Sequence, residues 1–145
     1  MQDRRNELIS GLGGGISGIL ALAYALLGPT YSFERMELHP DGTTSAISGS
    51  ASLLEVQSLQ PITILVFVVL ALLALGVAAG AYLHARRGMA GGRWLLGIST
   101  VILGFGVIIT GFSIGLLLLP SFLLALIATA LADRTQRRER AALLG

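Results

Sequence analysis

The sequence predicts an all-α membrane protein, a bundle of four transmembrane helices with both termini inside and a small external loop. The chain has 145 residues, of which 54% are hydrophobic and only 12% are charged. Its mean hydropathy of +0.80 is too apolar for a soluble domain of ordinary composition. Uncharged runs at residues 8–33, 56–85 and 94–132 each reach the roughly 20 residues that a spanning helix needs. We therefore expect a single integral membrane domain over residues 1–145.

The first predicted span covers residues 8–28. Arg4 and Arg5 precede it, and Ala23-Tyr-Ala25 resembles a signal-peptide cleavage site. The apolar run is longer than the apolar centre of a typical signal peptide. We therefore expect a retained first helix.

An external loop is predicted at residues 29–60. His39-Pro-Asp-Gly-Thr43 is a turn signature, and residues 31–38 and 43–48 can pair on either side of it as a short hairpin. An isolated hairpin is marginal in water, so it needs support from the bundle or from a partner.

The end of this loop has two open interpretations. Ser52-Leu-Leu-Glu55 matches a capping box, which favours a short helix that starts at about residue 53 and leads into Pro61. The alternative is a third strand through residues 52–56.

The second span is predicted at residues 61–84, and a cytoplasmic loop follows at 85–93. The next uncharged run, residues 94–132, is too long for one crossing. As a straight helix it would extend roughly 58 Å, about twice the hydrocarbon thickness of roughly 30 Å. Gly111 and Gly115 permit a tight reversal between them. We therefore predict spans at 94–111 and 115–132 and a cytoplasmic tail at 133–145.

The distribution of arginine supports this four-span topology. Short cytoplasmic segments of membrane proteins are enriched in basic residues. With four spans, the N-terminus, the loop at 85–93 and the tail at 133–145 all lie inside, and Arg35 is the one Arg outside. A three-span chain would export the Arg-rich tail.

Small residues recur at spacings of three, four or seven residues in the spans. Such seams let helix backbones approach closely in lipid. Gly76 and Gly80 also form a G-x-x-x-G on a neighbouring face of the second span. The residues that we predict to pack helices are Gly11, Gly14, Gly18, Ala71, Ala74, Ala78, Gly97, Gly104 and Gly111.

Few side chains in this sequence are candidates for metal binding or proton transfer. Glu37, His39 and Asp41 alternate along a possible strand face and could approach a metal ion, but a solvated loop edge is the favoured interpretation. His84 could be a proton shuttle or a haem ligand, although we expect an interfacial side chain that reaches toward water. Glu7 precedes the first span, with Arg4 and Arg5 as expected partners.

No span core contains a charged side chain, which argues against an ion-coupled pump. The chain has no cysteine, so thiol chemistry is excluded. We predict no catalytic, cofactor-binding or metal site and no enzymatic activity. The claudin-type combination of a Trp motif with two loop cysteines is absent, and no family is assigned.

These features predict a non-enzymatic accessory, assembly or structural subunit that acts through protein contacts in the membrane. A holin-like or channel-forming oligomer is the alternative, and a small-molecule exporter is less favoured. The expected partners are the lipid bilayer and a membrane protein or further copies of the chain. Nucleic acid is not expected, because the Arg-rich tail is better explained as a topology signal that attracts anionic lipid. The predicted interaction residues are Phe33, Glu34, Arg35, Met36, Glu37, His39, Asp41 and Glu55.

The expected location is the inner membrane of a bacterium. All ten basic residues are Arg and none is Lys, which is typical of proteins from GC-rich bacterial genomes.

Overall fold

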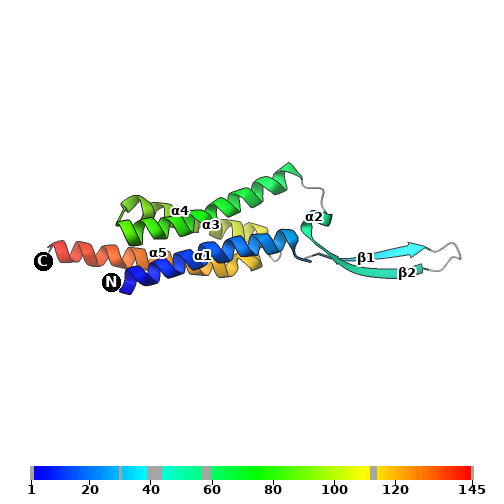
Figure 1. Ribbon diagram of the computed structural model, residues 1–145, viewed down its shortest axis with the longest axis horizontal. Coiled ribbons are helices and arrows are strands. Elements are labelled where there is room, and N and C mark those ends of the chain that lie inside the picture. Colours follow the sequence, from blue (N-terminus) through cyan, green and yellow to red (C-terminus); the bar gives the residue numbers. More distant parts are fainter. Residues whose placement is uncertain (1, 30, 39–43, 57–59, 112–113, 145) are drawn as a thin grey trace.

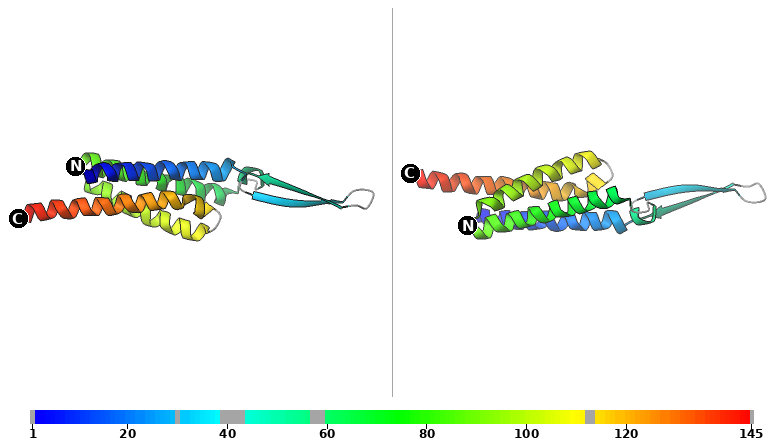
Figure 2. Two further views of the ribbon diagram at one scale, coloured as in Figure 1. Left: turned by 90° about the horizontal axis from the view of Figure 1, so that it is seen from below. Right: turned by 90° about the horizontal axis from the view of Figure 1, so that it is seen from above.

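A computed structural model describes residues 2–29, 31–38, 44–56, 60–111 and 114–144. Four long helices form an elongated bundle, and a β-hairpin projects from one end while both termini lie at the other (Figures 1 and 2). We call these the hairpin end and the terminal end. The elements are α1 (Gln2–Leu27), β1 (Tyr31–Leu38), β2 (Thr44–Ala51), α2 (Leu53–Val56), α3 (Pro61–Arg87), α4 (Ala90–Thr110) and α5 (Ile114–Leu144). The predicted fold class is confirmed.

The four long helices are each long and apolar enough to cross a membrane. Large apolar side chains cover their outer faces, and Ile108 and Ile109 of α4 are 76% and 80% exposed. Water would solvate such a surface poorly, whereas lipid chains match it. The chain is thus built as a small multi-pass integral membrane protein, with its outer faces suited to lipid.

Proline and glycine set the ends of the helices. Pro61 stands at the start of α3, where its missing N–H is not needed. Gly88 ends α3 with a φ of 62°, and its N–H donates to the His84 carbonyl. Gly111 ends α4 with a φ of 56°. Since α5 starts at Ile114, the predicted reversal of the long apolar run is confirmed.

All four long helices extend beyond their predicted spans. α1 begins at Gln2 rather than 8, α3 ends at Arg87 rather than 84, α4 begins at Ala90 rather than 94, and α5 continues to Leu144 rather than ending at 132. Hydropathy marks only the apolar part of a helix, whereas residues 133–144 consist largely of strong helix formers such as Ala, Leu, Arg and Glu. Asp133 also accepts a 3.0 Å hydrogen bond from Arg137 one turn later. The predicted tail is therefore helical as far as Leu144.

The loop between α1 and α3 contains the predicted hairpin. β1 and β2 pair antiparallel, from Tyr31 opposite Ala51 to Leu38 opposite Thr44. The second strand is longer than expected and reaches Ala51 instead of 48. Helix α2 follows, so residues 53–56 form the short helix and not a third strand. The turn signature at 39–43 lies outside the described residues.

Glycines bring α1 against its two neighbours. Gly11, Gly14, Gly15 and Gly18 are all buried. A Cβ added to Gly15 would stand 2.7 Å from the Ala78 Cβ of α3, and one added to Gly18 would stand 2.9 Å from the Ala74 Cβ. On the other side, the Ser121 hydroxyl of α5 donates a 2.6 Å hydrogen bond to the Gly14 carbonyl. Close backbone approach therefore joins α1 to both α3 and α5.

The contact between α3 and α4 uses a face other than the predicted one. Gly80 faces the backbone of α4, since an added Cβ would lie 2.6 Å from the Leu96 nitrogen. Gly92 likewise lies against α3, with an added Cβ 2.6 Å from the His84 nitrogen. At Gly97, by contrast, an added Cβ meets nothing within 4 Å.

Of the three glycines predicted to pack α4, Gly104 alone lies at a helix contact, where an added Cβ would stand 2.6 Å from the Phe122 ring. Gly97 is open, and Gly111 is exposed and serves as a helix cap. A seven-residue repeat shows that certain residues share one face of a helix, but it does not show whether that face contacts a neighbouring helix. The α4 residues that lie against Gly76 and Gly80 of α3 are instead Ser99 and Leu96.

Side-chain size in the core differs along the bundle. One cluster consists mainly of small residues, namely Val77, Ala81, Leu96, Ala125, Ala128 and Ala132. The other has larger residues and includes Leu22, Leu53, Phe67, Leu70, Leu103 and Leu118. Small side chains thus fill the core towards the terminal end, and bulky side chains fill it towards the hairpin end. Ala71 packs against the larger cluster.

Candidate functional site

The β-hairpin projects from the bundle, and many of its described residues are exposed. It extends along the long axis of the molecule, away from the helices (Figure 1). Glu34, Met36 and Glu37 of β1 are exposed, and Met36 reaches 80%. Opposite them lie Ser48, Ala46 and Ser45, which are small. Because successive residues of a strand point to opposite faces, Glu34 and Met36 share one face of the hairpin and Glu37 lies on the other.

The base of the hairpin is fixed to the bundle. Ala51 and Ser52 are buried where β2 ends. The next residue, Leu53 of α2, is 4% exposed and packs in the same cluster as Leu22 and Ala25 of α1. This contact anchors one strand directly above α1. The hairpin thus has a buried base and an exposed body.

The remaining predicted loop residues are distributed unevenly. Phe33 and Arg35 lie in β1 opposite Gly49 and Ile47, and Glu55 lies in α2. His39 and Asp41 lie outside the described residues, so the grouping with Glu37 is not observed. Within the described part of the chain, no cluster of three His, Asp or Glu side chains is arranged to hold a metal ion.

A buried pair of ionisable side chains joins α1 to α3. The Glu7 side chain is fully buried, and its Oε1 lies 2.7 Å from Nδ1 of His84. His84 is only 8% exposed, so the expectation that it reaches toward water is wrong. The physical reason is that a buried carboxylate needs a close hydrogen-bonding partner, and imidazole provides one. Glu7, expected to pair with Arg4 and Arg5, lies inside the bundle with His84.

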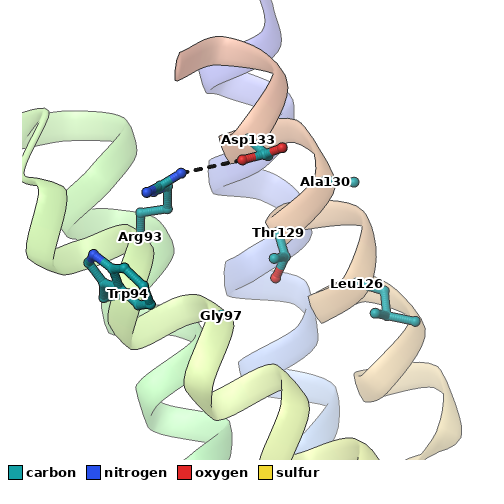
Figure 3. A pocket seen from close by; sticks show the side chains of 7 residues that line it. All are labelled: Arg93, Trp94, Gly97, Leu126, Thr129, Ala130 and Asp133. Carbon is teal, nitrogen blue, oxygen red and sulfur yellow. Dashed lines mark hydrogen bonds and ion pairs between the residues drawn. The ribbon is translucent and has the colours of Figure 1, made fainter. Parts of the chain in front are cut away.

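A groove lies between α4 and α5 near the terminal end. It has a volume of about 460 Å³ and is lined by Arg93, Trp94, Gly97, Leu126, Thr129, Ala130 and Asp133. Figure 3 shows Arg93 reaching from α4 to Asp133 on α5, with Trp94 beside it. The Arg93 Nη1 donates to Asp133 Oδ1 over 3.3 Å. The Arg93 Cζ lies 5.8 Å from the centre of the Trp94 ring, within cation–π range.

Hydroxyl groups link the same two helices deeper in the bundle. The oxygens of Thr100 and Thr129 are 3.1 Å apart. Each hydroxyl also lies within hydrogen-bond distance of a carbonyl four residues earlier in its own helix, at Leu96 and Ala125, so one hydroxyl donates to the other while the second donates to its own carbonyl. Side-chain hydrogen bonds of this kind hold helices together in lipid. The Thr129 hydroxyl is thus already hydrogen-bonded within the protein. The charged side chains that line the groove are Arg93 and Asp133.

Sequence reasoning missed both the buried pair and the groove, although each left a signal. Glu7 directly precedes the first uncharged run, and His84 stands at the end of the second. When two neighbouring helices run antiparallel, the start of the first span and the end of the second lie at the same depth in the membrane. Arg93 and Asp133 flank the run at residues 94–132 in the same way. Pairing the charged residues at adjacent span ends would have identified both contacts.

Comparison with protein-family models, curated protein sequences and solved structures finds no match for this chain.

Proposed function

We propose that this chain is a non-enzymatic accessory or assembly subunit of a bacterial inner membrane, and that it binds a protein partner through its β-hairpin. The observation that supports this most strongly is the two-stranded sheet itself. Each strand pairs on one side only, so each presents an unpaired outer edge within the described residues. Such edges are templates for pairing with another chain.

The stability of an isolated hairpin supports the same proposal. Two strands alone are marginally stable in water, and a third strand or a packed surface normally completes them. Here the base is anchored by Leu53, but Glu34, Met36 and Glu37 stand exposed. A partner surface would cover Met36 and pair its own polar groups with the Glu34 carboxylate on the same face of the strand.

The length of the hairpin indicates where the partner must reach. A strand of eight residues extends roughly 27 Å. The hairpin projects from the end of the helices that is opposite the termini (Figure 2). Its partner would therefore have a substantial part outside the bilayer on the side away from the Arg-rich segments. Either a larger membrane protein or a further copy of this chain fits this requirement.

The test is to replace residues 31–51 with a flexible Gly/Ser segment of equal length. We expect normal membrane insertion but loss of the native complex in a mild-detergent native gel, because the pairing edges are removed. A matched control replaces residues 139–145 at the opposite end of the molecule and should leave the complex intact. Assembly that survives loss of the hairpin would place recognition on the lipid-facing helices.

The channel-forming alternative predicts a different result, which can be measured with the purified protein. A holin-like oligomer would release a small dye from vesicles that contain the purified protein. We expect no release above that of protein-free vesicles, because a recognition subunit needs no water-filled path. Dye release that depends on protein concentration would favour the alternative.

A further inference from the structure

The groove between α4 and α5 changes in polarity along its length. Arg93 and Asp133 stand at its terminal end, directly outside the uncharged run at 94–132. Gly97, Leu126 and Ala130 line its interior and are apolar. Since the uncharged run spans the hydrocarbon region twice, its two charged flanks lie at the level of the lipid headgroups. The groove therefore has a charged mouth at the headgroup level and an apolar interior at the acyl-chain level.

Small residues keep this groove open. An added Cβ at Gly97 meets nothing within 4 Å, although Gly80, Gly92 and Gly104 all lie in tight helix contacts. Trp94 is 65% exposed and forms one wall beside Arg93. Tryptophan favours the membrane interface, where its ring is apolar and its N–H is solvated. The volume of about 460 Å³ lies in the range of sites for small ligands.

The mouth has a net positive charge. Asp133 accepts hydrogen bonds from Arg93 at one oxygen and from Arg137 at the other, so two guanidinium groups surround one carboxylate. Arg93 donates a single described bond to Asp133, whereas a guanidinium has five N–H groups. It can therefore bind a second anion. A guanidinium binds phosphate well because its planar N–H groups match the phosphate oxygens.

We propose that this groove binds an anionic phospholipid from the membrane, with the lipid phosphate on Arg93 and an acyl chain along Gly97 and Leu126. The charge at the mouth favours an anionic headgroup over a zwitterionic one, because Asp133, which is already doubly paired, is the one carboxylate among the described residues that line the groove. This site lies at the terminal end and is separate from the hairpin. It would fix the position of α4 and α5 at the headgroup layer.

The test is native mass spectrometry of the full chain in detergent, titrated with phosphatidylglycerol or with phosphatidylcholine of the same acyl chains. We expect one tightly retained phosphatidylglycerol and markedly weaker retention of phosphatidylcholine. Arg93→Gln should weaken phosphatidylglycerol binding about tenfold, as expected for loss of one charge-assisted contact. Arg86→Gln removes the same charge at an exposed position outside the groove and should change binding little.

A second variant tests the shape of the site. Gly97→Leu should fill the groove and abolish retention while the thermal unfolding temperature stays at or above that of the parent, because nothing lies within 4 Å of its Cβ. Gly91→Leu is the matched control, since its Cβ is equally unobstructed but lies outside the groove. Equal retention of both lipids, equal loss in Arg86→Gln and Arg93→Gln, or unchanged binding in Gly97→Leu would each overturn the proposal.

Discussion

At the scale of single residues, the contact between Glu7 and His84 buries two ionisable side chains between α1 and α3. A carboxylate with no solvent exposure is stable only when hydrogen bonds replace its lost hydration. His84 supplies such a bond over 2.7 Å and joins the second turn of α1 to the end of α3. The pair thus fixes the relative positions of these two helices at the terminal end.

Removing one member of this pair should destabilise the fold strongly. We expect Glu7→Ala to lower the free energy of unfolding by about 3–5 kcal/mol, because it leaves a buried polar group without its partner. The double replacement of Glu7 and His84 by Leu should cost less than Glu7→Ala. Chemical unfolding in detergent measures both, with exposed Glu37→Ala as the control. A loss in Glu7→Ala no larger than in that control would show that the pair contributes nothing.

At the scale of elements, the backbones of α3 and α4 cross in close contact at Gly80 and Gly92. A methyl group on Gly80 would meet the Leu96 nitrogen at 2.6 Å, so the helices would have to separate. We expect Gly80→Ala to destabilise the protein by about 1–3 kcal/mol through overpacking. Thermal unfolding in detergent reports this change.

Gly97→Ala on the partner helix is the matched control for that substitution. It adds the same methyl group where nothing lies within 4 Å, and alanine favours a helix over glycine by about 1 kcal/mol. It should therefore leave stability unchanged or raise it. The close-packing account fails if Gly80→Ala is tolerated as well as Gly97→Ala.

Some features of these elements could be predicted from the sequence, and others could not. Apolar length predicted four spans, and Gly111 marked the reversal before α5, because both depend on local properties of the chain. The helical extension at residues 133–144 escaped prediction since it is polar and hydropathy does not report it. The seam at Gly97 and Gly111 was assigned to packing because spacing alone cannot show which helix stands opposite. The Glu7 and His84 contact depends on the same tertiary information.

At the scale of the whole molecule, the two ends of the bundle differ in kind. The terminal end has both termini, the α3–α4 connection and nearly all of the arginines, whereas the hairpin end has β1 and β2 (Figure 1). An even number of spans places both termini on one side of a membrane. From the positive-inside rule, we propose that this side faces the cytoplasm.

Cysteine accessibility tests this topology in a chain that has no native cysteine. Ala46→Cys on the hairpin should react with a membrane-impermeant maleimide added to intact cells. Gln136→Cys in α5 should react only after the membrane is opened, because the terminal end faces inward. External labelling at residue 136 would rule out the four-span arrangement.

The central claim is that the hairpin, and not the outer faces of the helices, recognises a protein partner. Site-specific photo-crosslinking in native membranes tests it most directly, with the photoreactive residue at Met36 or at Leu72. Both side chains are exposed, at 80% and 62%, but Leu72 lies on α3 within the second uncharged run. We predict a discrete protein adduct from position 36 and lipid adducts alone from position 72. Protein adducts from position 72 with none from position 36 would contradict this account.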